Sequence, residues 1–188
     1  MANIDPLLVR NRDFAASGAW EGVPIVSREG VYVLTCLDPR VDPAAFFQLN
    51  LGDACVMRNA GGRVNSEVLA DLAYIGYLTD HEFKATPDFE VAVVHHTLCG
   101  RGFLGGDEFR RGFADLIGRD EAEVAALAVV HPEDTVRADV EKLRSATDIL
   151  PTTITVSGHI YDVATGRVTT VIPAAAMHAD AAARAESA

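Results

Sequence analysis

The chain has few basic residues and no long apolar run, and each scarcity excludes a class of protein. Its 16 Lys and Arg residues stand against 27 Asp and Glu residues, which gives a formal net charge of −11. A surplus of that sign disfavours contact with a phosphate backbone or an anionic membrane surface, so we expect neither nucleic acid nor membrane as a partner. No apolar run approaches the roughly 20 residues that span a bilayer.

Cysteine is also scarce. The three thiols of Cys36, Cys55 and Cys99 are too few for a disulfide framework in a chain of 188 residues. The amino-terminal stretch MANIDPLLVRNRDF mixes charges from its start and lacks the apolar centre of a signal peptide, which predicts a cytoplasmic location. In that reducing compartment a thiol is interpreted first as a metal ligand, a nucleophile or a small buried apolar group.

Apolar, β-branched segments alternate with amphipathic segments along the chain, which predicts strands alternating with helices. Strands are expected at 31–36, 54–57, 89–96, 154–162 and 167–173, and helices after Asp42, Ser66 and Asp134 and across 107–127. Such alternation builds βαβ units. We therefore predict an α/β fold, a Rossmann-like and mostly parallel sheet with helices on both faces and an antiparallel C-terminal edge strand.

Composition divides the chain into three predicted segments. Residues 1–30 form an N-terminal arm whose Phe14 and Trp20 have no local core, so we expect the arm to pack across a partner subunit. Residues 31–173 carry the predicted strands and helices and form the central domain. Residues 174–188 form an Ala-rich tail without an apolar stripe.

Three strong metal ligands are expected to meet at one edge of the sheet. Cys36 ends the first predicted strand, and His96 and Cys99 follow the third as H-x-x-C. In open parallel sheets, ligands bind beyond the carboxyl ends of the strands where the strand order reverses. Two thiolates and one imidazole are donors that Zn²⁺ prefers, and three protein ligands leave one position for water, as catalytic zinc sites do. The alternative is that the cysteines are buried strand ends and His96 is a core histidine.

A charged pair follows the first ligand. In C-L-D-P-R, Asp38 and Arg40 share a loop with Pro39, and a guanidinium beside a carboxylate lowers its pKa and fixes its orientation. Asp38 would accept a hydrogen bond from zinc-bound water, or become the fourth metal ligand in a closed state. The alternative is an ordinary salt bridge within a loop.

Three motifs together resemble the β-class carbonic anhydrases: C-L-D-P-R at 36–40, G-D-A-C-V-M-R-N-A-G at 52–61 and H-T-L-C-G at 96–100. The resemblance covers roughly residues 31–173 and extends to the terminal hairpin of short bacterial members. It implies a Rossmann-like sheet and a homodimer or a larger homo-oligomer built from dimers. It also implies zinc held by Cys36, His96 and Cys99, with Asp38 and Arg40 as the catalytic dyad.

Further positions match the same family pattern. Gly52, Asp53, Arg58, Asn59 and Gly61 are interpreted as the scaffold of the active-site wall. Gly61, Leu98, Gly100 and Cys55 are expected to line the pocket, and the backbone N–H of Gly61 or Gly100 is a candidate donor to a developing oxyanion.

The resemblance implies reversible hydration of carbon dioxide to bicarbonate by zinc-bound hydroxide, with carbon dioxide and bicarbonate as the small-molecule substrates. Carbonyl sulfide and carbon disulfide hydrolases share the scaffold and the ligands, and an apolar Leu98 in the pocket would favour them slightly. A third hypothesis is a non-catalytic zinc-binding assembly module, against which the Asp38–Arg40 pair speaks.

Overall fold

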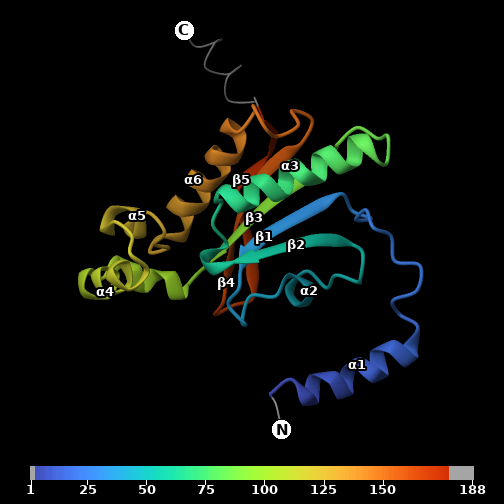
Figure 1. The fold of residues 1–188 in the computed structure, drawn as a ribbon, viewed down its shortest axis with the longest axis horizontal. Coiled ribbons are helices and arrows are strands. Elements are labelled where there is room, and N and C mark those ends of the chain that lie inside the picture. The colour runs from blue at the N-terminus through green and yellow to red at the C-terminus, as the bar shows by residue number, and fades with distance from the viewer. Residues whose placement is uncertain (1–2, 178–188) are drawn as a thin grey trace.

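The computed structural model describes residues 3–177, and its centre is a five-stranded sheet in the order β2-β1-β3-β4-β5 (Figure 1). Strands β1 (Val31–Cys36), β2 (Ala54–Asn59), β3 (Glu90–His96) and β4 (Thr155–Asp162) run parallel. Strand β5 (Arg167–Ala176) pairs antiparallel with β4 at the edge, as predicted. It continues past Pro173 to Ala176, and residues 178–188 of the predicted tail lie outside the described residues.

Helices α3 (Ser66–His81) and α6 (Pro132–Ser145) cover one face of this sheet (Figure 1). Their apolar side chains enclose the main core with the inward residues of β1, β3 and β4; among them Leu34, Leu72 and Val140 are almost completely buried. The short helix α2 (Pro43–Phe46) lies toward the other face, where Phe46 stacks on Tyr161 of β4 with ring centroids 4.6 Å apart. No helix in residues 3–177 is long and apolar enough to cross a membrane.

The helix starts follow local capping chemistry. Asp42 caps α2 through its side chain, with Pro43 as the first helical residue, as predicted. Ser66 is the first residue of α3, and the side chain of Asn65 accepts the capping hydrogen bond from Val68. The expectation that Asp134 caps α6 is wrong, because the helix begins at Pro132, whose fixed φ suits a first helical position, and Asp134 lies in the first turn.

Beyond the carboxyl ends of the strands, a helical lobe extends from the body (Figure 1). It contains the 3₁₀ segment η2 (Gly100–Gly105), α4 (Asp107–Ile117) and α5 (Glu121–Ala125). The break predicted near Gly118 is present, since that residue ends α4 in the left-handed conformation. The lobe has a small core of its own around Leu104, Ala114 and Val124.

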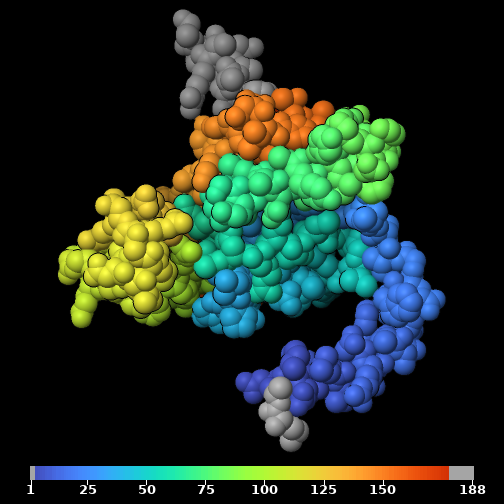
Figure 2. Space-filling view, in the orientation of Figure 1, coloured from blue at the N-terminus to red at the C-terminus, as the bar shows by residue number. Residues whose placement is uncertain are grey.

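Helix α1 (Asp5–Ser17) lies apart from the rest of the chain, and none of its residues is buried. Figure 2 shows this arm reaching away from the body. The predicted arm therefore contains a helix of 13 residues whose apolar side chains, among them Leu7, Leu8 and Phe14, are largely exposed.

The order of the strands places the site. Strand β1 pairs with β2 on one side and with β3 on the other, so the direction of chain crossover reverses between β1 and β3. Thr35 pairs with Val94, which brings the carboxyl ends of these two strands together at the reversal point. Cys36 and His96 are the last residues of those strands.

Candidate active site

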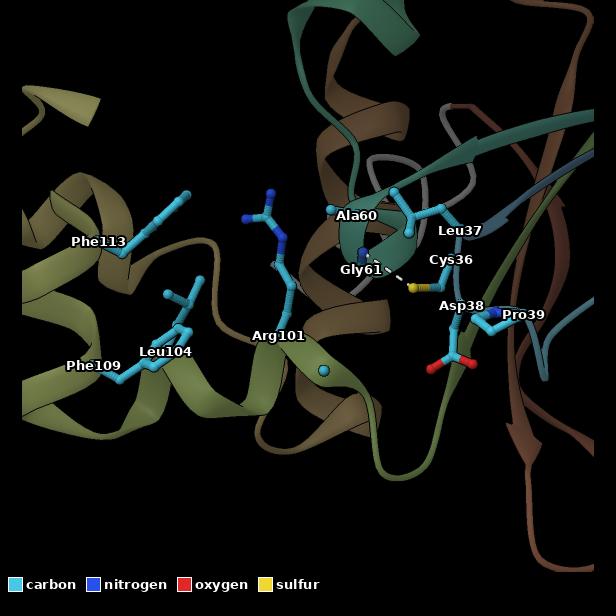
Figure 3. A pocket seen from close by; sticks show the side chains of 11 residues that line it. Cys36, Leu37, Asp38, Pro39, Ala60, Gly61, Arg101, Leu104, Phe109 and Phe113 are labelled. Carbon is cyan, nitrogen blue, oxygen red and sulfur yellow. Dashed lines mark hydrogen bonds between the residues drawn. The ribbon is translucent and has the colours of Figure 1, made fainter. Parts of the chain in front are cut away.

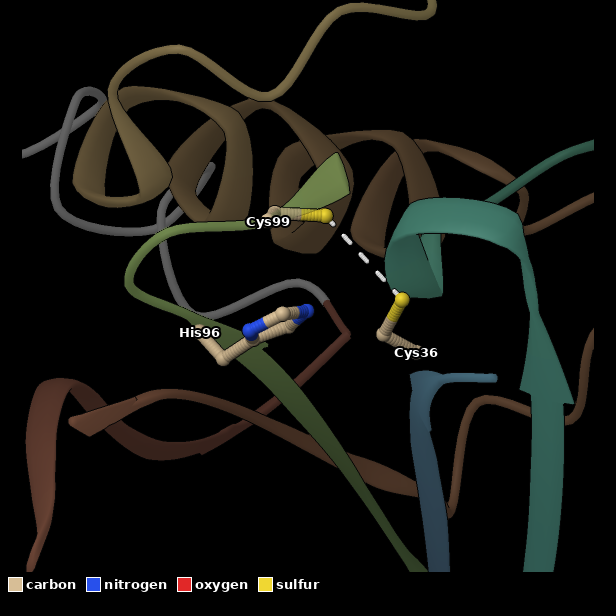
Figure 4. A group of neighbouring side chains, drawn as sticks. All are labelled: Cys36, His96 and Cys99. Atoms are coloured by element: carbon tan, nitrogen blue, oxygen red, sulfur yellow. Dashed lines mark hydrogen bonds between the residues drawn. The ribbon is translucent and has the colours of Figure 1, made fainter. Parts of the chain in front are cut away.

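Cys36, His96 and Cys99 converge at the ends of β1 and β3 (Figure 4). Their ligand atoms all lie within 4.8 Å of one another, and the two sulfurs are 4.0 Å apart although the cysteines are 63 positions apart along the chain. All three side chains are buried. The described residues thus place two sulfurs and one imidazole where they can hold a single metal ion.

The ring of His96 is prepared for coordination. Its Nδ1 lies 2.9 Å from the carbonyl oxygen of Thr97, and because a carbonyl only accepts, Nδ1 carries the proton. In the neutral ring, the other nitrogen, Nε2, carries the lone pair that can coordinate a metal, and it is buried without a hydrogen-bond partner. A backbone carbonyl that fixes the tautomer in this way is the usual support of a metal-ligating histidine. A buried nitrogen with no partner otherwise carries a desolvation penalty, which a metal ion would remove.

The pKa values of the two thiols are shifted in opposite directions. A hydrogen bond with Cys99 lowers the pKa of Cys36 to about 4, and contacts with His96 and the backbone N–H of Gly61, 3.3 Å from the sulfur, act in the same direction. The pKa of Cys99 is raised because it is hydrogen-bonded to Cys36 and buried. One thiolate is thus formed at neutral pH, and a divalent cation would displace the remaining proton.

The turn between His96 and Cys99 is strained. Leu98 has a φ of 56°, in the left-handed region that a branched, non-glycine residue enters at a cost of order 1 kcal/mol. In this conformation its carbonyl oxygen accepts a hydrogen bond of 3.0 Å from Nη2 of Arg40. The strained residue therefore connects the turn that carries the ligands to the Asp38–Arg40 pair.

Asp38 and Arg40 form a two-point ion pair beside the ligands. Arg40 Nε donates to Oδ1 at 3.0 Å and Nη2 to Oδ2 at 2.7 Å, and these hydrogen bonds lower the pKa of Asp38 to about 2. The carboxylate faces Arg40 and does not belong to the group of ligand atoms. Arg58 supports the loop by donating to the carbonyl oxygens of Cys36 and Asp38 at 3.0 and 2.8 Å.

A pocket of about 380 Å³ opens onto Cys36 and Asp38 (Figure 3). Gly61 and Gly100 line it at the positions expected from the sequence. Leu98 and Cys55 do not. The left-handed turn leaves Leu98 74% exposed, and Cys55 pairs with Tyr32 and packs against the main core.

The rest of the pocket wall was not foreseen from the sequence. It is formed by Leu37, Pro39 and Ala60 and by side chains of the helical lobe, namely Arg101, Leu104, Phe109 and Phe113. The i, i+4 spacing of Phe109 and Phe113 puts them on one face of α4, but only the docking of the lobe turns that face toward the metal ligands.

A carbonic anhydrase family model matches residues 31–102. The crystal structure of carbonic anhydrase from Streptococcus mutans is 30% identical, covers 91% of this chain and 98% of its own, and superposes with a TM-score of 0.70. The chain belongs to the β-carbonic anhydrase family. β-Carbonic anhydrase 1 of Mycobacterium tuberculosis is 28% identical over 173 residues, which is 92% of this chain and 100% of the relative. A carbon disulfide hydrolase of an Acidianus species is also 28% identical, over 88% of this chain and 87% of its own.

In this β-carbonic anhydrase, a buried ion pair supports the loop η1 (Ala60–Gly62) next to the ligands. Asp139 of α6 accepts hydrogen bonds from Arg63 Nε at 2.7 Å and Nη2 at 3.2 Å, and from the backbone N–H of Val64 at 3.2 Å. Burial alone would raise the pKa of Asp139, but hydrogen bonds from His95 and Arg63 outweigh it, and the net shift is downward. In the sequence, the only sign is an acidic residue on the apolar stripe of α6.

His95 joins this pair to the loop. Its ring is fully buried, with Nδ1 2.8 Å from the hydroxyl of Thr135 and Nε2 3.1 Å from the carbonyl oxygen of Gly62 and 3.2 Å from Asp139. His95 is therefore a packed residue on the face opposite His96, as the alternation of a strand predicts. Gly62 has a φ of 66°, and a Cβ there would lie 2.9 Å from the carbonyl carbon of Thr35, so the loop requires glycine.

Proposed function

We propose that this protein binds one zinc ion through Cys36, His96 and Cys99 and catalyses the reversible hydration of carbon dioxide to bicarbonate. The observation that carries the proposal is the buried group of three ligand atoms beside a carboxylate held by arginine. Thiolate and imidazole donors suit Zn²⁺ better than the hard cations Mg²⁺ and Ca²⁺. The unpartnered Nε2 of His96 supports a fit with such an ion.

The chain's own groups have distinct tasks in this reaction. When bound, zinc lowers the pKa of a coordinated water molecule toward about 7 and so supplies a nucleophile at neutral pH. Asp38, kept ionised and oriented by Arg40, accepts a hydrogen bond from the attacking group and aims it at the substrate carbon. The N–H of Gly61 donates to the sulfur of Cys36, so it stabilises a ligand and is not free to serve as an oxyanion donor.

The apolar wall of the pocket suits small, linear and uncharged substrates. Such a wall also supports a second candidate function, the hydrolysis of carbon disulfide or carbonyl sulfide. The Acidianus relative, which is named a carbon disulfide hydrolase, is the reason to consider it. In both functions Asp38 would orient the attacking group in the same way.

Two measurements test these proposals together. Metal analysis of purified protein should find one zinc per chain in the wild type and in Cys55→Ala, whose half-buried thiol packs against the main core, and none in Cys99→Ala. The zinc-loaded wild type is then assayed for carbon dioxide hydration and for sulfide release from carbonyl sulfide and carbon disulfide. Faster turnover of a sulfur substrate would replace the first function by the second. Stoichiometric zinc without turnover of any of these substrates would indicate a non-catalytic module.

We also propose that the protein is a homodimer, or a larger oligomer of dimers, in which α1 packs on a partner subunit. A helix of 13 residues with no buried side chain is marginal by itself in water. Leu7, Leu8 and Phe14 expose apolar surface that a partner would cover.

A further inference from the structure

One guanidinium lies in the wall of the pocket with no role in the mechanism above. Arg101 follows the ligand Cys99 by two positions in η2 and is partly buried between the apolar side chains of the lobe and Gly61 (Figure 3). Its Cδ is only 3.1 Å from the place where a Cβ on Gly61 would stand. The charged group therefore lies beside the residue that hydrogen-bonds Cys36.

The charge of Arg101 is poorly compensated by the protein. Arg40, Arg63 and Arg110 each bind a carboxylate at 2.7 Å or less. Among the described residues, the side chain of Arg101 makes a single hydrogen bond, from Nη1 to the carbonyl oxygen of Leu127 at 3.4 Å, although a guanidinium has five donors. Burial and electrostatic repulsion from Arg63 lower the pKa of Arg101, and the thiols of Cys99 and Cys36 offset this only in part. Partly buried arginines are normally paired, so this one has donors free for a ligand.

The chemistry of the pocket limits what that ligand can be. A guanidinium matches planar oxyanions because it donates two parallel hydrogen bonds to two oxygens. Apart from the carboxylate of Asp38, which repels an anion, the remaining wall is mostly apolar, so a charged ligand would otherwise lose its hydration there without compensation. The anion must also be small, because it shares about 380 Å³ with the reacting groups.

We propose that Arg101 is the anion-recognising residue of this pocket and that its ligand is bicarbonate, the planar oxyanion that the reaction forms and consumes. The proposal rests on the proposed function, since carbon disulfide and carbonyl sulfide are uncharged. On this proposal the two kinds of side chain in the pocket bind different species: the apolar side chains contact carbon dioxide, and Arg101 binds bicarbonate.

The kinetic test compares Arg101→Met, which removes the charge and keeps the length, with Arg101→Lys, which keeps the charge and loses the two-point geometry. Arg111→Met on the exposed side of α4 controls for the change in net charge. We expect the KM for bicarbonate in the dehydration direction, and its product-inhibition constant during hydration, to rise roughly tenfold in Arg101→Met, equivalent to about 1.4 kcal/mol. The increase should be smaller in Arg101→Lys and absent in Arg111→Met, with zinc content equal in all variants.

A binding measurement separates this inference from the proposed function. The ¹⁵N-labelled, zinc-loaded protein is titrated with bicarbonate at fixed pH and ionic strength, following the Arg101 Nε–Hε signal and the amide of Gly61 by NMR. Saturable shifts of both signals in the wild type, with a weaker shift of the Gly61 amide in Arg101→Met, support the subsite even if no turnover is found, in which case the proposed function fails alone. Normal turnover in the wild type with unchanged bicarbonate constants in Arg101→Met would overturn the subsite and leave the function standing. Neither shifts nor turnover would overturn both. If Arg101→Met does not fold, Arg101→Lys provides the same readouts.

Discussion

Replacing Asp139 by asparagine would break the ion pair under the active-site loop while keeping the volume of the side chain. The carboxylate is 2% exposed and accepts hydrogen bonds from Arg63 and from the backbone of Val64. In the variant, one acceptor oxygen becomes an NH₂ group, and Arg63 keeps its charge without a counter-ion. Removing one partner of a buried pair costs about 3–5 kcal/mol.

The lower end of that range applies here. The side chain of Arg63 is 15% exposed and still donates to the carbonyl oxygens of Ala126 and Ala128, so its charge is not left wholly without partners. We therefore expect a loss of about 3 kcal/mol in the free energy of unfolding. In a chain of this size each kcal/mol lowers Tm by about 2–4 °C, so Tm should fall by roughly 6–12 °C.

Urea and thermal unfolding at equal protein concentration measure this loss, because assembly couples stability to concentration. Glu141→Gln is the matched control, since it makes the same chemical change at an exposed position of α6 and should alter stability by less than about 0.5 kcal/mol. If the free energy of unfolding of Asp139→Asn falls by less than about 1 kcal/mol, the Arg63–Asp139 ion pair does not make the contribution to stability that is assigned to it here.

The pH dependence supplies a second check on the same variant. Because the pKa of Asp139 is lower in the folded than in the unfolded state, its contribution is fully present above the unfolded value of about 3.9 and is lost as pH falls through the folded value. The difference in stability between wild type and Asp139→Asn should therefore be constant near neutral pH and narrow below about pH 4. A difference that stays constant in acid would contradict the ionised state of Asp139.

Two further predictions concern the carboxylate of Asp38 and the arm. Asp38→Asn should retain zinc by metal analysis yet lower kcat/KM roughly a hundredfold or more. Since Arg40 holds the pKa of Asp38 at about 2, the wild-type pH–rate profile should show no loss of activity from protonation of Asp38 at any pH well above that value. Unimpaired turnover in Asp38→Asn would exclude the proposed role of this carboxylate. Phe14→Glu on α1 should reduce the molar mass measured by light scattering without changing zinc per chain, whereas an unchanged mass would remove the arm from the interface.

Much of the fold was predictable because its signals are local. The apolar run 31–36 coincides with β1, and the Asp42–Pro43 pair starts α2. The convergence of Cys36 and His96 was also accessible, since both end apolar strands and parallel strands bring their carboxyl ends to one edge of the sheet. The start of α6 was misplaced because Pro132 and Asp134 offer competing start signals within one turn.

Local sequence patterns are sufficient to identify the donor atoms and the strands that carry them, because ligand chemistry and strand formation depend on neighbouring residues. The three-dimensional packing of the chain decided which charges are neutralised. Asp139 meets Arg63 across 76 positions, while Arg101 meets no carboxylate among the described residues. It also decided that Leu98 turns away from the pocket and that Phe109 and Phe113 line it. Coulomb pairing and side-chain direction depend on distances between segments remote in the chain, and packing alone sets those distances.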